Sequence, residues 1–279
     1  MRIPLVNKFT CNENQLGSII KSLRRKNLLP ILDYTNENFK DHEKNFNKLS
    51  QLIRQHPNNL IAIKLSSLDI INNRNMSEDY LHKLTELAIN NNSKILLDAE
   101  NYIIQDDIND ISIQFMKEYN CEKVIIYKTY QMYRKDSLNI LKNDLLQSRN
   151  YFIGCKLVRG AYYNEDYKYK ILFDNIEDTH YNYDLGINLF SENNHFKDKL
   201  MCATHNQNSI NLAINKIKNN QLDNIEFAHL MGMSDILSNK LAKKYVTYKY
   251  LPYGHFRDTL PYLIRRLYEN YPMVLNLFK

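Results

Sequence analysis

The stretch YFIGCKLVRGAYY, residues 151–163, is a short apolar run that ends in cationic and aromatic side chains. Its apolar part is continuous rather than alternating, as in a parallel strand that is covered on both faces. Seven further runs of this kind lie at 28–34, 60–68, 94–100, 123–130, 199–206, 224–232 and 245–254. Together these runs are the predicted strands.

Helical patterns separate the predicted strands. They lie near 40–57, 78–92, 107–119, 134–147, 180–193, 207–219 and 233–243, with one more before the first strand and one after the last. This strict alternation predicts a single (βα)8 barrel of the TIM type. A doubly wound open sheet alternates in the same way, but no strand is followed by the GxGxxG pattern of a dinucleotide-binding unit. We expect residues 1–279 to form one domain, with 1–27 as a helical lead-in.

The composition is that of an ordinary globular chain, with 279 residues, 44% of them hydrophobic and 24% charged. The net charge of +6 comes from lysines spread along the chain, whereas nucleic-acid binding favours a clustered basic patch. We therefore expect no nucleic-acid partner. No cysteine or histidine spacing is typical of a zinc site, so no metal is predicted.

The N-terminus shows no apolar core of a signal peptide, and no apolar run reaches the length of a membrane span. We expect a cytoplasmic or peripheral membrane protein, or a mitochondrial one if the source is a eukaryote.

A barrel gathers functional side chains at the carboxyl ends of its strands. Lys64, Asp98 and Lys156 are embedded there among apolar residues, and a buried charge needs a partner. We therefore expect a lysine–aspartate contact inside the barrel mouth. Other polar residues close the predicted strands as well, where the chain turns in any case: Asp33, Glu37, Glu100, Lys128, Tyr130, Arg159, Tyr162, Thr204, His205, Asn206 and Tyr250.

The stretch LPYGHFRDTLPYLIRRLYEN, residues 251–270, predicts a loop followed by the last helix. Tyr262, Arg265, Arg266 and Glu269 follow spacings of three and four, so they share one helix face. The planar fork of an arginine fits a carboxylate through two parallel hydrogen bonds, so this face suits a small carboxylate ligand. A surface ion-pair network of the two arginines with Glu269 explains the same spacing.

Several motifs resemble the proline dehydrogenase family in order and spacing. They are LLPILDYTNEN (28–38), IAIKLSSL (61–68), LLDAE (96–100), KLVRGAYY (156–163), CATHN (202–206), IEFAHLMGM (225–233) and YLPYGHFRDTLPYLIRRLYEN (250–270). The resemblance runs from about residue 28 to the C-terminus. It implies a distorted (βα)8 barrel, with the last helix over the barrel mouth, that oxidises L-proline to Δ1-pyrroline-5-carboxylate with FAD.

The resemblance also implies roles for individual residues. Arg265 and Arg266 would hold the carboxylate of proline, and Asp98 and Lys156 would be catalytic. Asp98 would orient Lys64 and the tyrosines, and Glu37 would pair with an arginine and gate entry. The remaining substrate contacts would come from Lys64, Tyr250, Tyr262, Tyr162 and Leu230.

For the flavin, the resemblance points to Asp98, Lys128, Lys156, Arg159, Gly160, Ala161, Thr204, His205 and Glu269. Lys128 departs from the family, since bacterial members commonly have glutamine there. Gly160, having no side chain, would let the cofactor approach the backbone. The implied reaction transfers a hydride from proline C5 to flavin N5, and the family passes the electrons to membrane quinones.

Three other functions remain open from the residues alone. Lys64 or Lys156 could form a Schiff base in an aldolase on the same fold. The positive charge and the many tyrosines could serve RNA binding through stacking. A relict barrel could have kept the fold and lost the flavin through changes such as Lys128.

Overall fold

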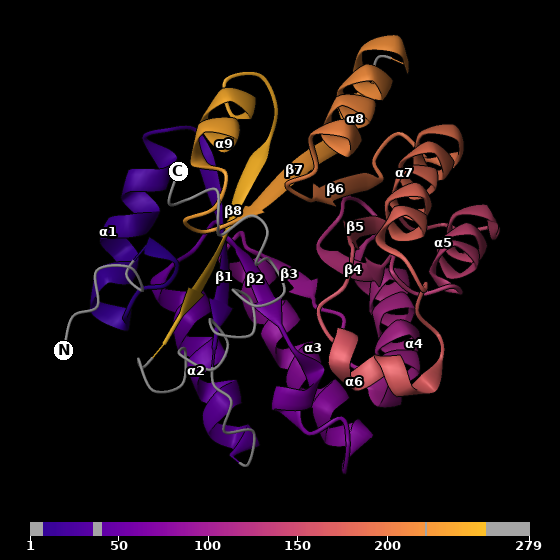
Figure 1. Cartoon of the computed structure of the whole chain (residues 1–279). Coiled ribbons are helices and arrows are strands. Elements are labelled where there is room, and N and C mark those ends of the chain that lie inside the picture. Colours follow the sequence, from indigo (N-terminus) through magenta and orange to yellow (C-terminus); the bar gives the residue numbers. More distant parts are fainter. Residues whose placement is uncertain (1–7, 36–40, 221, 255–279) are drawn as a thin grey trace.

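The structure is a computed structural model that describes residues 8–35, 41–220 and 222–254. Its strands form one closed barrel in the order β1 to β8, and every neighbouring pair is parallel. The barrel closes between β1 and β8, from Leu28 opposite Thr247 to Tyr34 opposite Tyr253 (Figure 1). The predicted (βα)8 barrel is therefore confirmed.

All predicted strands are present, and most are shorter than the apolar runs that mark them. They are β1 Leu28–Tyr34, β2 Leu60–Ile63, β3 Lys94–Leu97, β4 Ile126–Gln131, β5 Gly154–Val158, β6 Lys199–Ala203, β7 Ile225–Leu230 and β8 Thr247–Tyr253.

The helices surround the barrel, as Figure 1 shows. The longer ones are α1 Glu13–Arg24, α2 His42–Gln55, α3 Arg74–Asn90, α4 Tyr102–Tyr119, α5 Ser137–Leu146, α7 Ile176–Asn193, α8 Gln207–Asn220 and α9 Asp235–Leu241. Asparagine side chains cap several of them: Asn12, Asn73, Asn101 and Asn175 each accept a bond from a backbone N–H of the first turn. None of the helices in the described part of the chain combines the length and apolar character needed to cross a bilayer.

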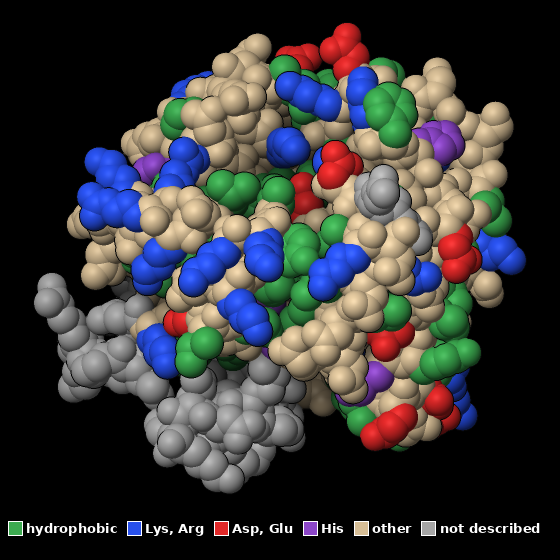
Figure 2. All heavy atoms as spheres, turned by 90° about the horizontal axis from the view of Figure 1, so that it is seen from above, with side chains coloured by type: hydrophobic (Ala, Val, Ile, Leu, Met, Phe, Trp, Pro, Cys, Tyr) green, Lys and Arg blue, Asp and Glu red, His purple; other side chains and the backbone are tan. Residues whose placement is uncertain are grey.

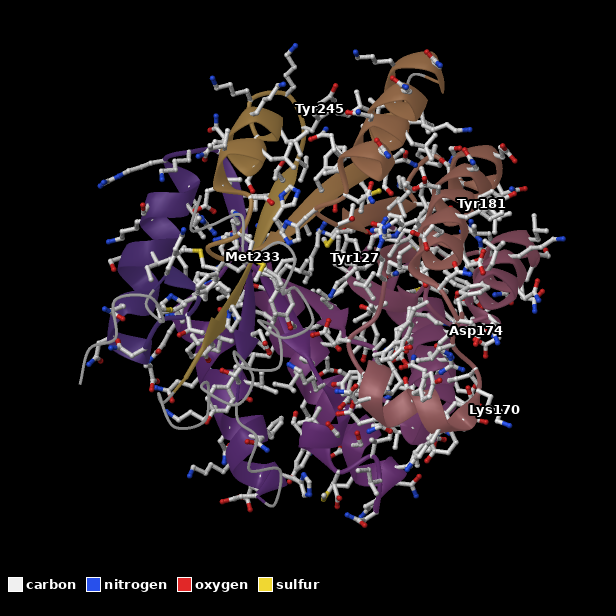
Figure 3. All side chains as sticks on the ribbon, viewed as in Figure 1. Tyr127, Lys170, Asp174, Tyr181, Met233 and Tyr245 are labelled. Atoms are coloured by element: carbon white, nitrogen blue, oxygen red, sulfur yellow. The ribbon has the colours of Figure 1, made fainter. Side chains whose placement is uncertain are left out.

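Short helices that were not predicted also occur in the described part of the chain, among them η2 Leu65–Leu68, α6 Tyr163–Asp166 and η3 Tyr167–Tyr169. They are too short to show a helical period in the sequence. The last two lie in the long connection after β5, where Figure 3 labels Lys170 and Asp174. The carboxylate of Asp166 fixes this connection, because it accepts a bond from Tyr102 N and another from Tyr133 Oη, each at 2.7 Å.

Alternate residues of each strand point to opposite sides of the barrel wall. The inner side chains form a small core that includes Ile31, Leu96, Tyr127 and Met201, and Figure 3 shows Tyr127 near the barrel centre. The outer side chains pack against the helices in a much larger core, which includes Leu97 and Leu157. Whether a polar residue faces the lumen or the helices thus depends on its position within the strand.

The amino-terminal end of the barrel is basic. Exposed Lys and Arg side chains lie in the loops that lead into β1, β4, β6 and β8, namely Arg25, Lys26, Lys123, Lys197, Lys243 and Lys244. Figure 2 shows this end of the molecule, with Lys and Arg side chains gathered over its centre and left. The opposite end, where the strands finish, carries the candidate site.

Candidate active site

Asp98, Lys156 and Tyr250 meet inside the barrel at its carboxyl end. Asp98 follows β3, Lys156 lies on β5 and Tyr250 on β8. Lys156 Nζ donates to Asp98 Oδ1 at 2.7 Å, and Tyr250 Oη donates to Asp98 Oδ2 at 2.5 Å. The Lys156 ammonium also lies 5.1 Å from the centre of the Tyr250 ring, close enough for a cation–π contact. The predicted lysine–aspartate contact in the mouth is present.

Asp98 stays ionised despite its burial. Burial alone would raise its pKa, but the charges of Lys156 and Lys64 and the bonds from Lys156 and Tyr250 hold the pKa below its ordinary value. The mouth therefore contains a fixed carboxylate between two cations.

Lys64 has a different main partner from the one expected. Its Nζ donates to Asp33 Oδ1 at 2.7 Å and lies 4.0 Å from Asp98 Oδ2. Asp33 lies on β1 and is only 1% exposed. Asp98, the expected partner of Lys64, is thus the more distant of the two carboxylates.

The loop that carries Lys64 is anchored by Glu100. Glu100 Oε1 accepts the backbone N–H of Ser66 at 2.9 Å, and Oε2 accepts the Ser66 hydroxyl. Burial raises the pKa of Glu100, and the bonds from Ser66 oppose this shift. Glu100 thereby ties the loop after β2 to the loop after β3.

Arg159 forms a second cationic site at the same end of the barrel. Its guanidinium donates to His180 Nδ1 at 2.9 Å, Thr204 Oγ1 at 2.5 Å and Ser209 Oγ at 3.0 Å, and it lies 4.4 Å from the Tyr183 ring centre. None of these partners is a carboxylate. Burial lowers the pKa of Arg159, and the charges of Tyr183 and Asp184 oppose this shift. Because the hydrogen-bond partners of the guanidinium are neutral, it suits an anionic ligand.

Gly160 is required for a reason other than the predicted one. Its φ is +147°, and a Cβ built there would lie 2.4 Å from the ring of Tyr133. The space beside this glycine is thus filled by a tyrosine of the same chain, and a side chain would be strained as well as blocked. The approach of a cofactor to this backbone stays a prediction.

His205 follows β6, close enough to Arg159 to feel its charge, and contacts residues of β7 and the start of α9. Its Nδ1 lies 2.9 Å from Ser234 Oγ, and its ring centre lies 5.3 Å from that of His229. Burial, together with nearby cations, lowers the pKa of His205 to about 4 and, with His205 itself, that of His229 to about 3. Both imidazoles are therefore neutral at pH 7.

The structure does not bring Lys128 to the mouth. Lys128 Nζ donates to Asp144 Oδ2 at 2.7 Å, and Tyr130 Oη donates to the same oxygen at 2.8 Å. Asp144 lies on α5, so Lys128 points from β4 toward the helices rather than into the lumen. The physical reason is strand alternation, because Tyr127 and Thr129 take the inward positions on either side of it.

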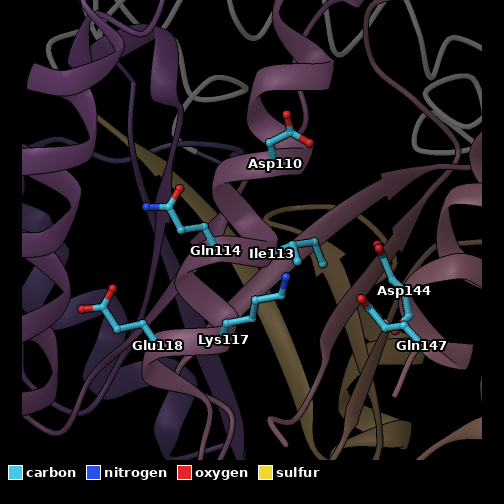
Figure 4. A pocket seen from close by; sticks show the side chains of 7 residues that line it. All are labelled: Asp110, Ile113, Gln114, Lys117, Glu118, Asp144 and Gln147. Atoms are coloured by element: carbon cyan, nitrogen blue, oxygen red, sulfur yellow. Dashed lines mark hydrogen bonds between the residues drawn. The ribbon is translucent and has the colours of Figure 1, made fainter. Parts of the chain in front are cut away.

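Asp144 also lines an open groove of about 590 Å³ between α4 and α5. Figure 4 shows it opposite side chains of α4, including Asp110 and Gln114. This groove lies on the outer side of the barrel wall, away from the carboxylate and lysines of the mouth.

The other predicted residues fall into two groups. Tyr162 is buried at the start of α6, Leu230 ends β7 beside the inner core, and Ala161 lies in the loop after β5. Glu37, Tyr262, Arg265, Arg266 and Glu269, with the whole last helix, lie outside the described residues.

Comparison with known proteins agrees with this architecture. The family model described as "Proline dehydrogenase" matches residues 18–274. "Proline dehydrogenase 1, mitochondrial" of Dictyostelium discoideum is 36% identical over 211 residues, which are 68% of this chain and 36% of that protein. "Hydroxyproline dehydrogenase" of Xenopus laevis is 33% identical over 208 residues, 68% of this chain and 44% of that protein.

Among solved structures, proline utilization A (PutA) from Bdellovibrio bacteriovorus, inactivated by N-propargylglycine, superposes with a TM-score of 0.87. It is 19% identical, and the match covers 96% of this chain and 33% of that one. At this identity the match supports the fold. The chain spans less than half the length of these two relatives, 36% and 44%. With the family model matched over residues 18–274, the chain belongs to the proline dehydrogenase family.

Proposed function

We propose that this chain oxidises L-proline to Δ1-pyrroline-5-carboxylate with FAD as its cofactor. The observation that carries the proposal is the group of alternating charges at the mouth, where Asp33, Lys64, Asp98 and Lys156 follow one another from β1 to β5. A family match over residues 18–274 supports the same activity.

The mouth can bind an amino acid and hold it still. Lys64 and Lys156 present ammonium groups whose positions are fixed by carboxylates at 2.7 Å. Tyr250 adds an aromatic wall that is itself held by Asp98. Fixed groups of this kind orient a substrate without a further loss of side-chain freedom. Arg265 and Arg266, which we propose as the main carboxylate ligands, lie outside the described residues.

The described residues fit a flavin in two respects. The lumen contains buried acceptors with no donor among the described residues, namely Thr129 Oγ1 and Gln131 Oε1, and a flavin carries donors in its ring N–H and in the hydroxyls of its ribityl chain. Arg159 is a cation surrounded by neutral partners, and the diphosphate that distinguishes FAD from FMN is an anion that such a group attracts. Arg159, Thr204 and His205 would hold that part, and Asp98 and Lys156 would lie at the ring.

When bound, FAD supplies the two-electron acceptor for the C5 hydride of proline, at its N5 atom. The residues of the chain control the protonation of the substrate amine, because a neutral amine loses a hydride more readily than an ammonium. Lys64 and Lys156 favour loss of the ammonium proton, and Asp33 and Asp98 oppose it.

A Schiff-base aldolase is disfavoured by the same geometry. A nucleophilic lysine must be neutral. Lys64 and Lys156 each donate to a carboxylate at 2.7 Å, and an amine held as the donor of an ion pair presents no lone pair to a carbonyl. A relict barrel without flavin makes a different prediction, since the purified protein would then be colourless.

The visible spectrum of the purified protein tests the proposal. We expect a yellow protein with flavin absorption that bleaches on anaerobic addition of L-proline, and not on addition of D-proline. trans-4-Hydroxy-L-proline is the second candidate substrate, which the Xenopus relative favours. A colourless protein, or a flavin that neither compound bleaches, would contradict the proposed activity.

We propose a quinone as the electron acceptor, and the same sample tests it, because a soluble quinone added after bleaching should restore the absorption. The basic amino-terminal end (Figure 2) supports peripheral contact with an anionic membrane. That end lies opposite the mouth, so a membrane bound there would not face the proline site.

A further inference from the structure

We propose that Asp33 is the positioning residue for Lys64, so that each lysine of the mouth has an aspartate of its own. Asp33 holds Lys64, and Asp98 holds Lys156. This inference names a further residue of the proline site and so rests on the proposed function. Neither the family match nor the resemblance assigned a role to Asp33.

The distances separate the two pairs. Lys64 Nζ is bonded to Asp33 Oδ1 at 2.7 Å, whereas Asp98 Oδ2 is 4.0 Å away, beyond hydrogen-bond range. Asp98 is already engaged through both oxygens, since Oδ1 accepts from Lys156 and Oδ2 from Tyr250. Asp98 therefore acts on Lys64 through charge alone.

The backbone around Lys64 is also held by hydrogen bonds, which fixes the point from which the side chain extends. Lys64 precedes η2, and its carbonyl accepts the backbone N–H of Ser67 at 3.0 Å and the Ser67 hydroxyl at 2.6 Å. The main chain of Lys64 is therefore held by Ser67, and its ammonium group is held by Asp33. Both contacts together fix the position of the ammonium.

The second oxygen of Asp33 points to a function beyond folding. Asp33 Oδ2 is buried and has no donor among the described residues. An unsatisfied buried acceptor destabilises a fold and calls for an explanation. Asp144 offers the contrast, because its Oδ2 accepts from both Lys128 and Tyr130. Asp33 Oδ2 faces the lumen and accepts no hydrogen bond from the described residues.

Other charged and titratable groups also face Lys64, and their effects on it must be distinguished from the effect of Asp33. They are Asp98 and Glu100 at the end of β3, Lys156 on β5 and the Tyr250 hydroxyl on β8. Removing Asp33 takes away the negative charge that lies 2.7 Å from the Lys64 ammonium, whereas Asp98 lies 4.0 Å away and is also bonded to Lys156. The neutral, reactive form of Lys64 is then favoured.

Amine labelling with acetic anhydride, mapped by mass spectrometry at pH 8, tests the pairing without any activity assay. We expect Asp33→Asn to raise the labelling rate of Lys64 by about fivefold or more, and Asp98→Asn to raise that of Lys156 by a similar factor. Each variant is the control for the other. Lys249, which is bonded to Asp235 at 2.7 Å outside the lumen, should react equally in all samples. If Asp98→Asn raises Lys64 labelling as much as Asp33→Asn does, the assignment is wrong.

A second variant covers the case in which Asp33→Asn does not fold. Removing both members of a buried ion pair costs less than removing one, so Asp33→Asn combined with Lys64→Met should fold. The combination of Asp33→Asn with Lys156→Met should not fold. If Lys156→Met, and not Lys64→Met, restored folding to Asp33→Asn, the pairing of Asp33 with Lys64 would be wrong.

Kinetics then connect the pairing with the substrate. In Asp33→Asn we expect KM for L-proline to rise about tenfold with kcat within about twofold, the pattern of a lost binding contact. A fall in kcat at unchanged KM would contradict a positioning role. If the wild-type protein does not oxidise proline, the proposed function fails, but the labelling experiment still decides the assignment of Asp33.

Discussion

Lys156 and Lys128 lie on neighbouring strands and have nearly the same immediate surroundings. Each is buried, each donates to an aspartate at 2.7 Å, and each lies near a tyrosine bonded to that aspartate. They differ in the side of the barrel wall to which they point. Lys156 faces the lumen and Lys128 faces α5, so the same local chemistry forms part of a site in one case and holds a helix in the other.

The comparison predicts that one substitution has two different outcomes. Lys156→Met should lower kcat/KM for L-proline by about a thousandfold, or about 4 kcal/mol, which is the upper range for loss of one preorganised group. The variant should fold, because Asp98 keeps Tyr250 and the nearby charge of Lys64. Steady-state assays with a dye acceptor and a urea unfolding curve measure both quantities. Retained activity would show that the lumen position does not matter.

Lys128→Met is the matched substitution on the other side of the wall. It leaves the Asp144 carboxylate with Tyr130 as its remaining described donor, so the free energy of unfolding should fall by about 3 kcal/mol. Because Lys128 does not reach the mouth, KM and kcat should stay within about twofold of wild type. Adding Asp144→Leu should restore much of the stability. A specific loss of flavin from the folded variant would return Lys128 to the cofactor site.

The barrel was predictable from sequence because parallel strands buried on both faces leave continuous apolar runs. That same property hides which face a residue occupies. In a half-exposed strand, apolar and polar residues alternate and reveal the two sides. Lys128 instead lies between Tyr127 and Thr129, and Lys156 lies between Cys155 and Leu157, so the immediate neighbours do not mark the inner side. Only the closed barrel shows that Thr129 lies opposite Lys156 and shares its side, while Lys128 does not.

The residues of the site were easier to predict from the sequence than the ion pairs that they form with one another. Lys64, Asp98 and Lys156 were identified because a charge inside an apolar run requires a partner, and the structure brings them together. The choice of partner depends on the register between strands. Asp33 lies opposite Ala62 in the β1–β2 pairing, two residues before Lys64, and no pattern within either strand specifies this offset.

The smallest expected effect concerns the histidines on the helix side of the wall. His229 contacts Ser238 Oγ through Nδ1 at 3.0 Å, while its Nε2 is buried without a partner among the described residues. Its folded-state pKa of about 3 is below the ordinary value of 6.5. The stability that its neutral form contributes is therefore complete above pH 6.5 and is lost as the pH falls toward 3.

For this histidine we expect a loss of about 2.5 kcal/mol between pH 7 and pH 4.5, since the unfolded chain binds the proton and the folded chain does not. His229→Gln keeps a donor toward Ser238 and cannot titrate, so its unfolding free energy should fall less steeply over that range. Urea unfolding at both pH values measures the difference. Carboxylates titrate in both proteins, and comparison with wild type removes their contribution. Equal slopes would mean that His229 gains its proton while the chain is still folded, and that its burial on the helix side of the wall does not keep it neutral.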